Sequence, residues 1–333
     1  MVFSQARDRL RGWRAQLLPP QVLMVLDDGA VRIGALPLGG RPRLQRAWSL
    51  ALPDGTCSGG MPQQVTALGD FIGDFLVEQG LVQAQVRACL PPVASRWRLL
   101  HGTAAGALED PAALQRQEER LGLDDPLEAL YVDVLPLADE ADTALLVAAR
   151  RDLVQAWHEV FDLAGADLVQ LEPAQTCEWR AMARLWRDEQ LTGAGDGDGA
   201  TTTDLVLALD TRGSWLWLAQ AGRPVADWWL PALSWPFKAA ALAELAGELQ
   251  ERQRFWDGLQ AAASRWRCWL HGPLAEQEGL LEALRDHPIA AQISLLDPLQ
   301  RGWLRLPAKG ERQGLSGPQL VRLQGLLAGV PRR

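Results

Sequence analysis

The most informative stretch of this 333-residue chain is VLMVLDDGAVRIGAL, residues 22–36. Five apolar residues end in Asp27-Asp28-Gly29, and alternating apolar residues follow. An Asp-Gly pair between two apolar segments is typical of a tight β-hairpin turn. The stretch therefore predicts two antiparallel strands joined by an acidic turn.

The same pattern recurs in the second half of the chain. DLVLALDTRGSWLWLAQ, residues 204–220, again places an acidic turn between two apolar strands. In each half we expect a third strand, a helix and a further strand, at 48–52, 61–79 and 86–90 and again at 225–230, 239–263 and 267–271. A repeated β-β-β-α-β order indicates an α/β chain built from a duplicated unit whose sheets are covered by helices on both faces. Two such units enclose a cleft, and the acidic turns are expected to face it.

Composition excludes several classes of protein. The formal net charge of −8 disfavours binding to nucleic acid. The four Cys and four His are scattered without a C-x-x-C pair, which argues against a disulfide framework or a zinc site and favours a reducing cytoplasm. No apolar run approaches the roughly 18 residues that a membrane span needs.

The chain divides at a stretch rich in Gly, Asp and Thr, residues 192–203, which predicts a flexible linker. Residues 1–20 form a basic amphipathic segment with four arginines, either a loose terminus or a contact with an anionic membrane surface. The expected units are a first half over 21–191, a reduced second half over 204–310, and a tail with a short helix over 311–333.

Several local strings resemble the actin-like superfamily and, within it, the PilM proteins of type IV pilus assembly. The closest is LLVAARRDLV, residues 145–154, which is similar to a strand-to-helix junction of that family. The other similar strings are RACLPPVAS at 87–95, AGADLV at 164–169 with Glu172-Pro173, WLHGPL at 269–274 and LLDPL at 295–299. The resemblance implies an actin-like fold of two ribonuclease H-like halves, with a small α/β subdomain inserted at about 91–143.

The resemblance also implies an ATP site between two phosphate-binding hairpins and a Gly-rich adenosine turn, but all three motifs depart from the family pattern. The first turn keeps Asp27 and Gly29 and lacks the serine run. In the adenosine turn, Pro273 follows Gly272 and removes a backbone donor. The second turn holds Asp210, Arg212, Gly213 and Ser214, with Arg212 where the family has Gly. These departures predict a degenerate site with weak or lost ATP binding.

Several of these residues remain candidates for binding a metal or a phosphate, or for catalysis. Asp27 and Asp210 are candidate magnesium ligands, and Glu172 is the candidate catalytic acid, although turn and helix-cap preferences explain all three equally well. Arg212 is a candidate for gripping a phosphate by its charge. No cofactor is assigned from the sequence.

Tryptophan is concentrated in the second half, where eight of the 15 Trp lie between 215 and 269. Alternating Trp215 and Trp217 fit one face of a strand, whereas adjacent Trp228 and Trp229 must point to opposite faces. Core packing and a partner surface are both consistent with this concentration.

The resemblance implies a cytoplasmic scaffold at the inner membrane, for type IV pilus assembly or a related competence or secretion system. Its partner would be the short cytoplasmic tail of a PilN-like membrane protein, with other pilus components as further partners. The candidate docking regions are the strand Ala94–His101 and the region Pro111–Leu135. The alternatives are a phosphotransferase of the actin-like sugar-kinase superfamily and the cytoplasmic part of a type II secretion scaffold. The degenerate motifs favour a protein without enzymatic activity.

Overall fold

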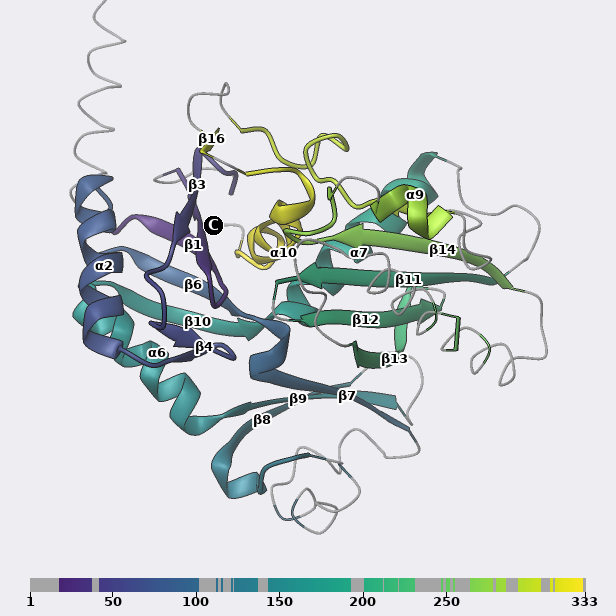
Figure 1. Cartoon of the computed structure of the whole chain (residues 1–333), viewed down its shortest axis with the longest axis horizontal. Coiled ribbons are helices and arrows are strands. Elements are labelled where there is room, and N and C mark those ends of the chain that lie inside the picture. Colours follow the sequence, from purple (N-terminus) through teal and green to yellow (C-terminus); the bar gives the residue numbers. More distant parts are fainter. Residues whose placement is uncertain are drawn as a thin grey trace, which may run out of the picture.

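The computed structural model arranges the chain as two α/β halves with a smaller sheet attached to the first (Figure 1). The strands of each half pair in the order that the duplicated sequence pattern predicts. The residues that the structure describes are 18–37, 42–101, 112, 115, 121, 123–136, 143–192, 201–211, 213–220, 222–230, 247, 250–251, 254, 264–277, 280–285, 293–306, 312–313 and 315–331.

The sheet of the first half has the strand order β10-β6-β1-β2-β3-β16. The acidic hairpin supplies its antiparallel centre, because β1 pairs with β2 and β2 with β3, whereas β6 and β10 add in parallel. The bounds of these strands are β1 Gln21–Leu26, β2 Ala30–Ala35, β3 Arg46–Ala51, β6 Gln85–Leu90, β10 Asp167–Pro173 and β16 Arg312–Gln313.

Helices cover both faces of this sheet, as near-continuous apolar strands require. On one face, Met24 of β1 packs against α2 (Val65–Glu78) and α6 (Arg151–Leu163). On the other face, Leu23 of β1 packs against α7 (Ala174–Thr192) and α10 (Val321–Ala328).

The sheet of the second half repeats the same order as β13-β12-β11-β14-β15. Its first three strands are antiparallel, and the last two add in parallel. The strands are β11 Thr201–Asp210, β12 Gly213–Gln220, β13 Arg223–Leu230, β14 Ser264–His271 and β15 Ile293–Leu295. The predicted duplication of the unit is confirmed.

The small sheet has the order β7-β9-β8 and lies below the first half in Figure 1. Its strands are β7 Ser95–His101, β8 Leu130–Pro136 and β9 Thr143–Arg150. Because β9 pairs with both other strands, this sheet extends to Arg150, beyond the boundary near 143 that the sequence indicated.

The helix expected over 61–79 begins later than predicted. Residues 57–62 form the short hairpin of β4 (Cys57–Ser58) and β5 (Met61–Pro62), because the Asp28 carboxylate accepts hydrogen bonds from the backbone N–H of Gly59 and Gly60. In the second half, residues 272–276 form a turn that precedes α9 (Leu280–Arg285).

Several other expectations fall wholly or mostly outside the described residues. These are the amphipathic segment 1–20, the first part of the docking region Pro111–Leu135, the linker core at 193–200 and the helix at 239–263.

The C-terminal segment returns to the first half. Strand β16 pairs with β3, and α10 lies between the two large sheets, beside α7 (Figure 1). A glycine permits this close packing, since a Cβ on Gly325 would lie 1.9 Å from the carbonyl oxygen of Cys177 in α7. The tail is therefore part of the first half's core.

The tryptophans of the second sheet divide between its faces as expected. Trp215 and Trp217 are buried on the face toward α7, whereas Trp228 packs on the opposite face. Trp229 is 41% exposed, so it does point away from its neighbour.

The small sheet also contacts the second half through β7 and β13. The Trp97 and Trp217 rings meet edge to face with centroids 5.7 Å apart. Beside them, Arg98 Nη1 lies 3.8 Å from Asp227 Oδ1. Burial raises the pKa of Asp227 to about 6, although Arg98 acts to lower it.

This raised pKa predicts a pH-dependent stability. Because the folded state holds the proton more tightly than the unfolded state, the favourable contribution is complete below about pH 4 and is lost as the pH rises through about 6. At about pH 7.5 we expect Asp227→Asn to be more stable than the native chain by ~1–2 kcal/mol, with no difference near pH 4. Urea unfolding at both pH values measures this, and exposed Asp70→Asn is the control. A less stable Asp227→Asn at pH 7.5 would contradict the assignment.

Candidate functional site

The two acidic turns come from different halves of the chain and meet in the cleft between them. Asp27 directly follows β1, and Asp210 is the last residue of β11. Both line one cavity, together with Pro91 and Pro92 at the start of the small sheet. Burial raises the pKa of Asp27, and the nearby charge of Asp210 raises it further.

The cavity that both aspartates line is small among the described residues. Its volume is about 10 Å³, which is room for about one water molecule. The Trp229 ring occupies the place beside Gly213, because a Cβ on this glycine would lie 2.1 Å from that ring. The space beside the backbone of this turn is therefore occupied by an indole ring.

A guanidinium group from the C-terminal helix completes the cluster. Arg322 in α10 donates from Nη1 to Asp210 Oδ1 at 3.0 Å and from Nη2 to Asp210 Oδ2 at 2.5 Å. Its Nε donates to Glu178 Oε1 in α7 at 2.8 Å. The other Glu178 oxygen accepts a bond from Trp217 Nε1 at 3.2 Å, and His271 Nε2 lies 3.6 Å from Oε1. One arginine thus joins two carboxylates, one from each half of the chain.

The ionisation of this cluster follows from its contacts. Burial alone would raise the pKa of Glu178, but His271 and Arg322 outweigh it and lower the pKa to about 2. Burial acts to lower the pKa of Arg322, and its two carboxylate partners raise it well above the ordinary value. The group is therefore a buried, charged network, with Arg322 4% exposed.

The first turn is also engaged in structural contacts. Asp27 Oδ1 accepts a bond from the backbone N–H of Asp28 at 2.8 Å, and its Oδ2 lies 3.6 Å from Arg32 Nη1. The Asp28 carboxylate holds the β4–β5 turn and accepts a weak bond from Cys57 Sγ at 3.5 Å. Burial and the Asp28 carboxylate raise the pKa of the Cys57 thiol to about 12. The four free cysteines are all buried.

The other residues predicted for nucleotide binding have different environments. Gly29 has open space around its Cα, and the buried Ser214 hydroxyl has no hydrogen-bond partner among the described residues. Gly272 has a φ of +100°, and its N–H donates to the Pro318 carbonyl at 3.1 Å, so the C-terminal segment closes on the adenosine turn. Arg212 lies outside the described residues.

The catalytic candidate Glu172 does not join the cluster. Its Oε1 accepts a bond from Gln170 at 3.1 Å, and its Oε2 lies 2.6 Å from Arg180 Nη1. Burial raises the pKa of Glu172, against the lowering effect of Arg180. The acid that shares Arg322 with Asp210 is Glu178, which the sequence did not point to.

A magnesium ion, for which Asp27 and Asp210 were the candidate ligands, does not fit the contacts of Asp210. Both oxygens of Asp210 are bonded to Arg322, so they are not free to bind a cation. Within the described part of the chain, no three His, Cys, Asp or Glu side chains are grouped to hold a metal. The arginine takes the place where a cation would balance these carboxylates.

Two solved structures are similar to this chain in fold. A chain of a PilM–PilN type IV pilus biogenesis complex superposes with a TM-score of 0.74 at 18% identity, over 93% of this chain and 99% of that one. The fold is actin-like. A protein of actin-like ATPase fold and unknown function from Bacteroides thetaiotaomicron has a TM-score of 0.52 at 10% identity, over 92% and 95% of the chains. No protein-family model matches this actin-like chain, and no curated protein matches its sequence.

Proposed function

We propose that this actin-like chain is a PilM-like scaffold of a type IV pilus or a related assembly system. The observation that supports the proposal most strongly is the structural likeness to a chain of the PilM–PilN complex, which extends over nearly the full length of both chains. None of the described helices is long and apolar enough to span a bilayer. The scaffold would act at the cytoplasmic face of the inner membrane, held there by a membrane-anchored partner.

The proposed scaffold binds no ATP. The support is the cluster described above, in which Arg322 neutralises Asp210 and Glu178 and Trp229 packs on Gly213. A phosphate group would have to displace a bidentate, charge-assisted arginine pair, which is among the stronger polar contacts in proteins. The same contacts disfavour the alternative of a sugar-kinase-like phosphotransferase, which needs an open phosphate site.

The partner is the short cytoplasmic tail of a PilN-like membrane protein, and the small sheet offers a place for it. Strand β8 lies at one edge of the order β7-β9-β8, whereas β7 at the other edge is packed against β13. An extended peptide can add to an exposed edge through main-chain hydrogen bonds, with pockets for alternate side chains. Tyr131 and Leu135 on β8 are 49% and 48% exposed and can serve as its apolar contacts.

The test is a calorimetric titration with a synthetic peptide of the tail, taken from the PilN-like protein encoded beside this chain. We expect saturable binding, and we expect the double variant Tyr131→Asp/Leu135→Asp to weaken it by about tenfold or more, because two apolar contacts become charged. Val77→Asp, at a residue of α2 that is 62% exposed, is the matched control and should bind the tail like the native chain. No binding to the folded native chain, or equal binding by both variants, would contradict the proposal.

A further inference from the structure

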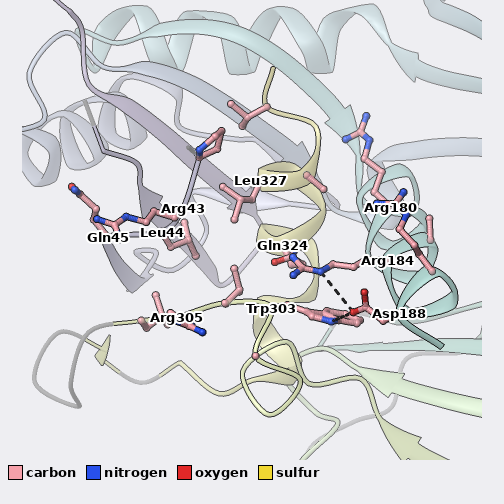
Figure 2. Close-up of a pocket in the computed structure, with 18 of the residues that line it drawn as sticks. Arg43, Leu44, Gln45, Arg180, Arg184, Asp188, Trp303, Arg305, Gln324 and Leu327 are labelled. Atoms are coloured by element: carbon pink, nitrogen blue, oxygen red, sulfur yellow. Dashed lines mark hydrogen bonds and ion pairs between the residues drawn. The ribbon is translucent and has the colours of Figure 1, made fainter. Parts of the chain in front are cut away.

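A large cavity lies over the end of α10, on another part of the molecule than β8. Its volume is about 1120 Å³, and it is enclosed by the segment 42–46 that leads into β3, by α7 and by the segment 302–306 (Figure 2). Figure 2 shows Gln324 and Leu327 of α10 between these elements. The cavity exceeds the roughly 300–1,000 Å³ of ordinary small-ligand pockets.

The lining is strongly cationic in a chain whose net charge is −8. Among the described lining residues the one acidic side chain is Asp188. It is already engaged, because Oδ2 accepts a bond from Trp303 Nε1 at 2.7 Å and lies 4.0 Å from Arg184 Nε. The arginines that line the cavity are Arg43, Arg46, Arg180, Arg184, Arg187 and Arg305.

Four of these six arginines have no acidic partner in the described part of the chain, and three of the four also make no hydrogen bond there. Arg180 pairs with Glu172, and Arg46 donates to the Gln79 carbonyl. Arg43, Arg187 and Arg305 are exposed and make no ion pair or hydrogen bond with any described residue. They come from three separate elements, so the fold gathers like charges that repel one another unless an anion is bound.

The floor of the cavity is apolar. Leu44, Leu306 and Leu327 line it between the arginines, and Leu306 and Leu327 are only partly buried. A phosphorylated small molecule would pair with the arginines but would leave the leucines exposed to water. A peptide with apolar side chains and flanking carboxylates can contact the leucines and the arginines at the same time.

We propose that this cavity binds an acidic amphipathic peptide segment of another protein. Its apolar side chains pack on Leu44, Leu306 and Leu327, and its carboxylates pair with Arg43, Arg187 and Arg305. The proposal does not depend on the tail docking at β8, because neither β8 residue named above lines this cavity.

The experiment uses the full chain and a short fluorescein-labelled peptide with a repeating Glu-Leu-Glu-Glu-Leu sequence, followed by fluorescence anisotropy at low salt. Pyrophosphate and vesicles of anionic phospholipid are tested as competing anions. The triple variant Arg43→Glu/Arg187→Glu/Arg305→Glu reverses the unpaired charges. The control triple Arg96→Glu/Arg150→Glu/Arg254→Glu makes the same change of net charge elsewhere on the surface.

We expect the native chain to bind the peptide saturably. The cavity triple should weaken this binding by about tenfold or more, because three arginines that attract the peptide carboxylates become glutamates that repel them. The control triple should weaken it by about threefold or less, through the general change of charge alone. Circular dichroism checks that both triples are folded. Equal weakening by the two triples, or no peptide binding to the native chain, overturns the proposal. Binding of pyrophosphate or vesicles, lost in the cavity triple, without peptide binding overturns it in favour of those anions.

Discussion

Replacing Arg322 by methionine is expected to lower the free energy of unfolding by ~3–5 kcal/mol, the usual cost of leaving one partner of a buried ion pair uncompensated. Asp210 would lose two charge-assisted bonds and Glu178 one, while both stay buried, at 6% and 0% exposure. Methionine keeps most of the volume of the arginine stem, so the loss reports on charge and hydrogen bonds more than on packing. Urea unfolding followed by tryptophan fluorescence measures it.

Two comparisons separate charge from packing at this site. Arg305→Met removes an exposed arginine and should change the free energy of unfolding by less than ~0.5 kcal/mol. The triple variant Arg322→Met/Asp210→Asn/Glu178→Gln removes the buried charges together, and we expect it to recover much of the stability that Arg322→Met loses. A loss below ~1 kcal/mol in Arg322→Met would show that the network does not join the two halves.

Replacing Gly325 by alanine should be the second most damaging change. The new Cβ would lie 1.9 Å from the Cys177 carbonyl oxygen, so α10 and α7 must move apart. Overpacking of this kind costs ~1–3 kcal/mol, against a gain of ~1 kcal/mol from the better helix propensity of alanine. Because the obstruction is backbone and cannot rotate away, we expect the cost to lie at the upper end of this range and the net loss to be ~2 kcal/mol. Thermal unfolding provides the measurement.

The matched control for Gly325 is Gly247→Ala. Gly247 is also helical, but a Cβ added there meets no atom within 4 Å. This substitution should leave stability unchanged or raise it by up to ~1 kcal/mol. If Gly325→Ala behaved like Gly247→Ala, the close packing of α10 on α7 would be wrong.

Much of the fold could be predicted from the sequence because its signals are local. The hairpins around Asp27 and Asp210 combine short apolar strands with turn residues, and both are fixed by neighbouring residues. The duplicated order then follows from recognising one unit twice. The start of α2 was predicted wrongly, because the Asp28 carboxylate holds Gly59 and Gly60 from a distant part of the chain.

The candidate site could be predicted only in part. The sequence identified the acidic turns, but Arg322 and Glu178 lie 112 and 32 residues from Asp210, and no local pattern connects them. One signal was available: Glu178 falls on the buried face of α7 with Ala174, Cys177 and Ala181. A charge on an apolar helix face requires a partner, although the sequence does not say which.

The central claim is that Arg322 and Trp229 have closed the nucleotide site of an actin-like fold. Isothermal titration calorimetry of the folded chain with Mg-ATP tests it most directly. We predict no saturable heat up to about millimolar nucleotide, since binding would have to break the bidentate pair between Arg322 and Asp210. A dissociation constant of about micromolar or below would contradict the claim.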